Sequence, residues 1–226
     1  MIKAKGDTKL YNLDQQRQLL ARQWRDSDND YNSQDNNDEQ CSSSMTKDQL
    51  LNVIIPWKFG KGKPRNALKP LLQSNKEGDV IKASMLAFNF AESSTANNDN
   101  DDDDGDVHHY VQEAIKSLCQ LSGVGPATAS AVLSAYCPQS FAFMDDEVIE
   151  CLYEAKRGYT LKIYMAVNDR CVDIAEQLNE ASCSGSDGSG GNTSEWTPAD
   201  VAKALWTVAT MSARNDEVGL GKVFCD

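Results

Sequence analysis

The chain has few histidines, no long apolar run and no paired cysteine motif. Its two histidines are the neighbours His108 and His109, so no Ser-His-Asp or Cys-His triad can be assembled from the pattern. No apolar stretch reaches the roughly 18 residues that a membrane-spanning helix needs, so no membrane partner is expected. The first residues lack the apolar segment of a signal peptide, and we therefore expect an intracellular protein of the nucleus or cytoplasm.

The seven cysteines are odd in number, and no two of them have the spacing of a Cys-x-x-Cys motif. Both features disfavour a disulfide framework and a zinc ribbon. Four cysteines lie in apolar helical contexts and are expected to be buried free thiols: Cys119, Cys137, Cys151 and Cys171. Metal binding by the two histidines is not expected, because the adjacent aspartate run lacks the pattern of a calcium-binding loop.

The net charge of −12 is unevenly distributed. Residues 26–41 carry six acids and residues 92–106 carry seven, with no base in either run. Without these thirteen acids the net charge of −12 would become +1, so the rest of the chain is close to neutral. Residues 57–84 are basic instead, with seven bases and two acids. The acidic total therefore neither excludes nor supports a DNA partner.

Apolar residues recur with helical spacing along nearly the whole chain, and no strand pattern is found. We therefore expect an all-α fold, as one compact unit or as two helical lobes. The expected helices cover residues 12–24, 46–56, 66–73, 76–90, 107–120, 126–136, 146–153, 161–181 and 197–212. The first of them forms an N-terminal unit in residues 1–25, followed by an acidic disordered loop in 26–45. A helical domain then spans 46–226, with an acidic mobile insertion at 92–106 and a Ser/Gly loop at 183–195.

A glycine-rich turn between two of these helices is the most specific feature. Gly123 and Gly125 flank Val124, and Pro126 stands at the first turn of the next helix. Two glycines permit positive φ and expose backbone N–H groups at a helix start, which is a site for a phosphate oxygen. We expect Val124 to fill the gap between the two helices. The alternative is an ordinary tight turn between helices.

The turn resembles the helix-hairpin-helix of the DNA glycosylase superfamily, which includes endonuclease III and the adenine and 3-methyladenine glycosylases. The matching residues are Leu121, Gly123, Val124, Gly125, Thr128 and Ala129. The resemblance covers residues 107–155. Together with the basic stretch 57–65, it also resembles a eukaryotic branch of this superfamily. It implies a helix-hairpin-helix glycosylase-like bundle, DNA binding and a role in base excision repair.

The same resemblance implies a catalytic aspartate. The family's essential aspartate lies as far beyond the position of Ala127 as Asp145 does, and Asp145-Asp146 resembles the acid pair of the alkylbase glycosylases. Either acid can fill the role, and Asp145 is favoured. The alternative is an N-cap, since an acid before an apolar helical run is common.

Two departures from the family limit the expected chemistry. Bifunctional members have a lysine where this chain has Ala127, and alanine forms no Schiff base, so lyase chemistry through this position is excluded. Many members also bind an iron–sulfur cluster through four C-terminal cysteines. Here only Cys225 lies near the C-terminal end, so neither that cluster nor any other cofactor is expected.

A base removed from DNA must enter a pocket lined by aromatic side chains. Six candidates are available, each of which is expected in the core more often than in a pocket: Trp57, Phe59, Tyr153, Tyr164, Trp196 and Trp206. Residues 57–65 are expected to form a basic loop whose charged side chains contact phosphates, or are merely solvated: Lys58, Lys61, Lys63 and Arg65. Gly123, Val124, Gly125 and Thr128 complete the expected DNA contacts.

The sequence thus predicts a monofunctional DNA N-glycosylase, without lyase activity, or a degenerate relative that has lost the reaction. The alternative is a non-enzymatic module that binds a protein partner through a glycosylase scaffold. The acidic runs favour the alternative, whereas the glycine turn and the spaced aspartate favour the first.

Overall fold

The computed structural model describes residues 8–26, 43–62, 65–96, 104–153, 158–184 and 195–217, and every regular element in these ranges is a helix. The expected all-α fold is therefore confirmed. The elements are α1 (Thr8–Asp26), α2 (Lys47–Gln49), η1 (Leu50–Ile54), α3 (Ile55–Lys61), η2 (Asn66–Leu68), α4 (Lys69–Ser74), α5 (Glu77–Ala96), α6 (Asp104–Leu118), α7 (Pro126–Tyr136), α8 (Asp146–Leu152), α9 (Leu161–Ser184) and α10 (Pro198–Glu217).

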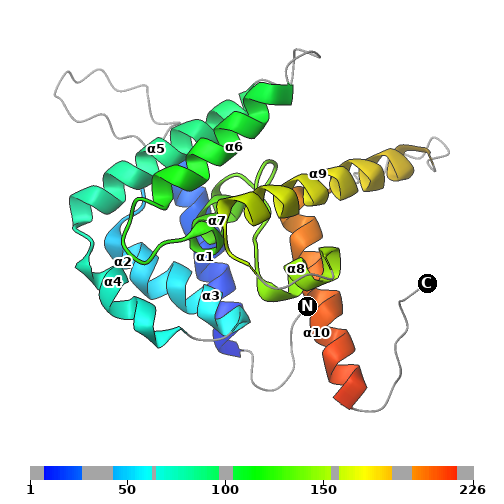
Figure 1. Ribbon diagram of the computed structural model, residues 1–226, viewed down its shortest axis with the longest axis horizontal. Coiled ribbons are helices and arrows are strands. Elements are labelled where there is room, and N and C mark those ends of the chain that lie inside the picture. The colour runs from blue at the N-terminus through cyan, green and yellow to red at the C-terminus, as the bar shows by residue number, and fades with distance from the viewer. Residues whose placement is uncertain are drawn as a thin grey trace.

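Helix α7 is the centre of the molecule, and nine of its residues are buried. It is rich in alanine and serine, so neighbouring helices can approach it closely. The long helices α5 and α6 pack side by side on one side of it, and α8, α9 and α10 lie on the other (Figure 1). The buried residues of all these helices form one continuous hydrophobic core.

Helix α1 is tied to α7 by two arginines. Arg17 donates to the Ala131 carbonyl at 2.9 Å, and Arg25 donates to the carbonyls of Ala135 and Tyr136 at 2.8 and 2.7 Å. A cation at the last carbonyls of a helix is favoured by the helix dipole. The N-terminal helix is therefore packed into the core.

Helices α2, η1 and α3 form one continuous helical segment, which corrects the expectation that this helix ends near Pro56. Proline has no N–H and its ring clashes with the carbonyl four residues earlier. The turn before it is π-helical, with Ile55 N–H bonded to the Leu50 carbonyl, and such a wider turn accommodates the ring. Residues 57–61, expected to be loop, are consequently helical.

The second acidic run is also partly helical, contrary to the expected mobile loop over 92–106. Helix α5 continues to Ala96 and α6 begins at Asp104. Ser94 is buried and its hydroxyl donates to the Ala91 carbonyl at 2.7 Å, so tertiary packing carries α5 into the run.

The cysteines follow the expectation in part. Cys137 and Cys171 are buried and Cys119 is half-buried, but Cys151 is exposed, which corrects the prediction for that thiol. Of the expected disordered loop 26–45, the structure describes only the two ends, where α1 reaches Asp26 and Met45 is fully buried, so residues 43–45 are ordered contrary to the expectation. Most of the two acidic runs and of the Ser/Gly loop lies outside the described residues.

Candidate functional site

Asp145 stands at the start of α8 and its carboxylate is the N-cap of that helix. The side-chain Oδ1 accepts from the backbone N–H of Val148 at 2.9 Å. The segment before it is fixed by Ser130 of α7, whose hydroxyl accepts from the N–H of Met144 at 3.2 Å. The carboxylate is 8% exposed. Its position is therefore set by two helices at once.

Lys61, the last residue of α3, lies against this carboxylate. Its Nζ is 3.3 Å from Asp145 Oδ2, and the lysine side chain is only 9% exposed. Oδ2 accepts no hydrogen bond among the described residues, so the contact is an ion pair without hydrogen-bond geometry.

Three aromatic rings surround the ammonium group of Lys61. Its Nζ lies 4.4 Å from the ring centre of Trp206, 4.8 Å from Phe143 and 5.2 Å from Trp57. A cation over aromatic faces is attracted by their quadrupoles. These rings come from α3, α10 and the segment before α8, so tertiary structure brings them together.

Burial sets the protonation of this pair. It lowers the pKa of Lys61, an effect that the Asp145 charge partly offsets and that Arg17 adds to. Burial also raises the pKa of Asp145, against the opposing effect of Lys61. Each shift disfavours the charged form of its group, because burial removes the hydration of the charge.

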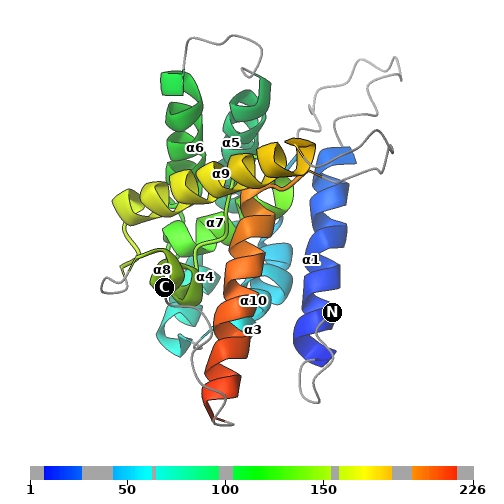
Figure 2. The same cartoon turned by 90° about the vertical axis from the view of Figure 1, so that its right-hand side faces the viewer.

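Lys61, but not Asp145, lines a groove of about 800 Å³ between α1 and α10, two helices that run side by side in Figure 2. The groove is lined by Lys61, by all three rings, and by five cationic against two acidic side chains. The cationic ones are Arg17, Arg22, Arg25, Lys61 and Lys203, and the acidic ones are Asp14 and Asp200. An acidic protein thus presents a mostly cationic, aromatic groove.

Trp206, which lines this groove, has an unsatisfied indole N–H group. Its Nε1–H is buried and has no hydrogen-bond partner among the described residues. Trp57, by contrast, donates its Nε1–H to Asp14 Oδ1 at 2.9 Å. Buried donors are nearly always satisfied in native proteins, so an orphaned one in a groove points to an acceptor supplied from outside.

Asp146, the next residue, faces different partners. The Tyr159 hydroxyl donates to its Oδ1, and the guanidinium of Arg65 lies 4.3 Å from the Tyr159 ring centre. Lys58 lies near these residues, because the charges of Arg65 and Asp146 both shift its pKa. Burial, followed by the neighbouring Arg65, lowers the pKa of Lys58 to about 8. Lys58 and Arg65 thus lie near enough for their charges to interact, and together they offer two cations to an anion.

The glycine turn joins α6 to α7 as expected, but its two glycines differ. Gly123 has a φ of 78°, whereas Gly125 is extended with a φ of −115°, which corrects the expectation that both need glycine's freedom. A Cβ on Gly123 would lie 3.2 Å from the Leu72 backbone nitrogen, and one on Gly125 would meet open space. Only Gly123 is required by conformation.

Asn75 holds the turn from the end of α4. Its side chain accepts from the Ser122 N–H at 2.8 Å and donates to the Ser122 carbonyl at 2.9 Å. The N–H groups of Gly123 and Gly125 make no hydrogen bond within the described part of the chain. Asn75 therefore fixes the turn from the side of α4, and the unpaired N–H groups of Gly123 and Gly125 lie beside the start of α7.

The remaining predicted residues are placed as follows. Val124 is buried at 8% exposure and fills the turn as expected, Thr128 is buried on α7, and Lys63 lies outside the described residues. Ala127 is buried one residue into α7. Ser130, which contacts the segment of Asp145, is four residues from Pro126, or about 6 Å along the helix axis. The turn and the acid thus lie close to one another along α7.

Of the six aromatic candidates, Trp57 and Trp206 line the groove. Tyr164 is fully buried core, Phe59 packs against the core, Tyr153 donates to the Ala166 carbonyl, and Trp196 is 39% exposed. Sequence reasoning missed Phe143 and the pairing of Lys61 with Asp145. The signal for Phe143 was its place two residues before the acid.

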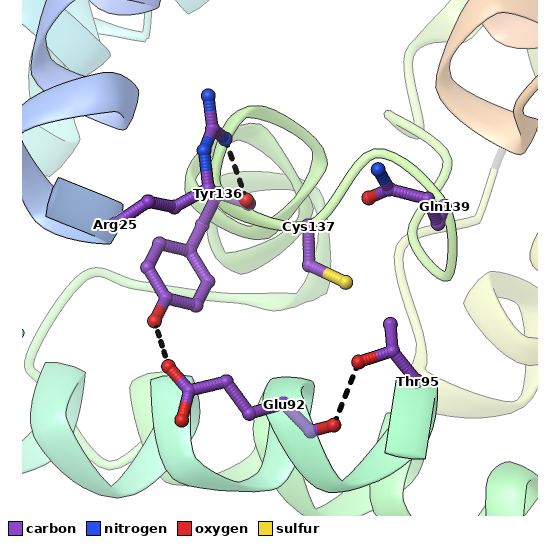
Figure 3. A pocket seen from close by; sticks show the side chains of 6 residues that line it. All are labelled: Arg25, Glu92, Thr95, Tyr136, Cys137 and Gln139. Carbon is purple, nitrogen blue, oxygen red and sulfur yellow. Dashed lines mark hydrogen bonds between the residues drawn. The ribbon is translucent and has the colours of Figure 1, made fainter. Parts of the chain in front are cut away.

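A smaller hollow of about 310 Å³ lies at the C-terminal end of α7 and shares Arg25 with the groove (Figure 3). There the Tyr136 hydroxyl donates to the carboxylate of Glu92, and Arg25 and Cys137 contribute to the wall. Burial raises the pKa of the Cys137 thiol, which makes it a poor nucleophile. The residues around this hollow connect α1, α5 and α7, and their arrangement indicates a structural role rather than a catalytic one.

No metal centre emerges from the part of the chain that the structure describes, where no three His, Cys, Asp or Glu side chains gather closely enough to hold an ion. None of the described helices is both long and apolar enough to cross a membrane. Comparison of the chain with protein-family models, with curated proteins and with solved structures gives no match.

Proposed function

We propose that this protein binds DNA and cleaves the N-glycosidic bond of a base, with Asp145 as the acidic group at the sugar. The observation that carries the proposal is the buried Asp145 carboxylate, which lies 3.3 Å behind the Lys61 ammonium of a cationic, aromatic groove. A carboxylate held by a helix start and shielded from water interacts strongly with a positive charge that develops beside it. The oxocarbenium-like sugar of a breaking glycosidic bond has such a charge.

The groove offers what a base outside the helix would need. The rings of Trp206, Phe143 and Trp57 offer stacking surfaces, and the unused Trp206 Nε1–H offers a hydrogen bond to a base or sugar oxygen. The volume of about 800 Å³ is in the range of sites that hold small organic ligands. For a base to stack there, the Lys61 side chain must yield part of the space between the rings.

Backbone contacts would come from the turn and from the cations beside α8. The free N–H groups of Gly123 and Gly125 suit a phosphate oxygen, and Lys58 and Arg65 suit a second one. Such contacts position the duplex without reading its sequence. The acidic runs do not oppose this arrangement, because the groove itself is mostly cationic.

The test is titration of the purified protein with labelled duplexes, intact, carrying damaged bases or carrying an abasic site, at two salt concentrations. Affinity that falls steeply as salt rises, together with released base, is the expected result. Salt-sensitive binding without release from any duplex would indicate a degenerate glycosylase. No binding at low salt would contradict the proposal as a whole.

A second candidate function is a protein-binding module. The two helices that flank the groove carry exposed apolar side chains, with Tyr11 50% exposed on α1 and Val208 and Met211 49% and 58% exposed on α10. Such residues suit an apolar interface, whose affinity responds little to salt. A partner whose binding is insensitive to salt and is lost in Met211→Asp would favour this candidate.

A further inference from the structure

The groove between α1 and α10 is long and follows both helices. Its lining residues run from Leu10 to Arg25 on α1 and from Ala199 to Met211 on α10. On both helices they recur every three or four positions, which is the spacing of one continuous helical face. At a rise of about 1.5 Å per residue, each wall is about 20 Å long. The groove therefore has the length of a helix of three to four turns.

The two walls run in opposite directions and share little contact with each other. The end of α1 and the start of α10 meet near the end of α7, where Arg25 and the Ala199 N–H both donate to backbone carbonyls (Figure 2). Elsewhere α1 packs against α3 and α7, and α10 packs against α8 and α9. The facing sides of α1 and α10 are thus unpartnered within the described ranges.

The end of the groove near α7 is cationic. Arg22, Arg25 and Lys203 line it, and Arg22 and Lys203 are exposed and form no ion pair with any described acid. The one carboxylate at this end, Asp200, accepts from the Thr197 hydroxyl at 2.7 Å. Cations without internal partners attract anionic groups of a ligand.

The opposite end of the groove is apolar. It is lined by Leu10 and Tyr11 from the start of α1 and by Met211 from the end of α10, and Tyr11 and Met211 are 50% and 58% exposed. Exposed apolar side chains that gather on one surface indicate an interaction site, and methionine adapts its shape to a partner. A phosphate backbone would bury none of this apolar area, whereas an apolar helix face would.

We propose that the groove between α1 and α10 binds an amphipathic helix of a partner protein, with acidic side chains at one end of that helix and apolar ones at the other. The acidic side chains lie between Arg22 and Lys203, and the apolar ones between Tyr11 and Met211. A helix satisfies its own backbone hydrogen bonds, so it can lie on the aromatic floor that Trp206 contributes to. A helix in the groove would also exclude a DNA base.

The inference specifies the partner of the protein-binding candidate and does not rest on base removal. It gives that partner a secondary structure, a length and a charged end. Because one end of the interface is ionic, its affinity should fall moderately with salt, less steeply than the affinity for DNA. This dependence distinguishes the groove from a purely apolar interface.

The experiment uses a synthetic helical peptide of about 16 residues, which matches the groove in length. Its first turn carries glutamates, and leucines follow at three- or four-residue spacing on one face. The fluorescently labelled peptide is titrated with the full chain, and its anisotropy is expected to show saturable binding. A peptide of the same composition with the leucines scattered around the helix should not bind. A photoreactive group at a central leucine should crosslink to α1 and α10.

Charge reversal tests the cationic end. The double variant Arg22→Glu, Lys203→Glu should bind the peptide about tenfold more weakly, because like charges then face each other. A peptide with lysines in place of the glutamates should recover binding to the double variant, which excludes misfolding as the cause. Lys82→Glu, on the exposed face of α5, is the matched control and should bind as wild type does.

The outcomes separate this proposal from the glycosylase. No saturable binding, crosslinks outside α1 and α10, or equal binding by the double variant overturns the helix site. Binding only after deletion of residues 28–40 would assign the groove to the chain's own acidic run, and self-association lost in the double variant would assign it to a second copy, so either result overturns it too. Base release without peptide binding contradicts this proposal alone, and peptide binding without DNA binding contradicts the glycosylase alone.

Discussion

Asp145 and Asp146 are consecutive residues with different surroundings. Asp145 is buried, caps α8 and faces Lys61 among aromatic rings, whereas Asp146 is half-buried and faces Tyr159. Adjacent helical positions are rotated by about 100°, so the start of one helix serves two regions. Asp145 has a buried partner in Lys61, whereas Asp146 lies near Lys58, which is itself partly buried, and near the exposed Arg65. Asp145 is therefore the candidate for chemistry, and the residues around Asp146 are the candidate for phosphate contact.

The largest expected effect is on base release. Asp145→Asn should reduce the single-turnover rate of base release by about a hundredfold or more, because the carboxylate charge is lost. Asparagine is also a good N-cap, so α8 should persist. Asp146→Asn should act mainly on DNA affinity. Rates and affinities of both variants on the same damaged duplex test the comparison. Equal losses of rate would show that the two acids do not differ in role.

The two glycines of the turn offer a matched pair for stability. Gly123→Ser should lower the free energy of unfolding by about 2–4 kcal/mol, because a side chain is strained at positive φ and meets Leu71 and Leu72. Gly125→Ser should change it by less than about 0.5 kcal/mol, since the backbone is extended and the space is open. Urea denaturation followed by circular dichroism measures both. A strongly destabilised Gly125→Ser would mean that the turn is held differently.

Asn75 tests whether the turn is braced from α4. Asn75→Ala removes both hydrogen bonds to Ser122 and should cost about 1–3 kcal/mol of unfolding free energy. DNA affinity should fall as well, if the free N–H groups of the turn hold a phosphate. Asn89→Ala, on the exposed face of α5, is the control and should leave both quantities near the wild-type values. An unchanged stability in Asn75→Ala would exclude the brace.

The smallest effect concerns the pH dependence of stability at Lys58. Its folded-state pKa is about 8, against 10.5 when solvated. Between these values the unfolded chain binds a proton that the folded chain does not, so Lys58 reduces stability as the pH falls from 10.5 to about 8. Wild type should therefore gain more stability than Lys58→Met when the pH is raised across this window. If stability changed equally with pH in wild type and in Lys58→Met, Lys58 would have the pKa of a solvated lysine and the prediction would be wrong.

The sequence predicted much of the scaffold because local signals determine it. Helical periodicity and caps gave the all-α class and the extent of α7, with Pro126 in its first turn. An acid before an apolar run gave the cap of α8, and the structure selects Asp145 of the two candidates. The conformation of each glycine was less accessible, since Gly123 depends on its packing against Leu72 of α4.

The arrangement of the site depended on contacts that no local pattern encodes. Lys61 is 84 residues from Asp145 in the sequence, and its basic, glycine-punctuated surroundings suggested a solvated loop. The π-helical turn before Pro56 extends the helix instead and directs Lys61 into the core. Trp206 reaches the same point from α10. Periodicity indicates which residues are buried but not which distant partners they meet.

The most direct test of the central claim, a DNA sugar site at Asp145, is hydrogen–deuterium exchange with and without a duplex carrying an abasic site. The account predicts slower exchange in peptides that contain residues 57–61, 121–128 and 141–148. Exchange along the outer face of α5 should not change. Protection confined to that face, or no protection at a saturating concentration of duplex, would contradict the account.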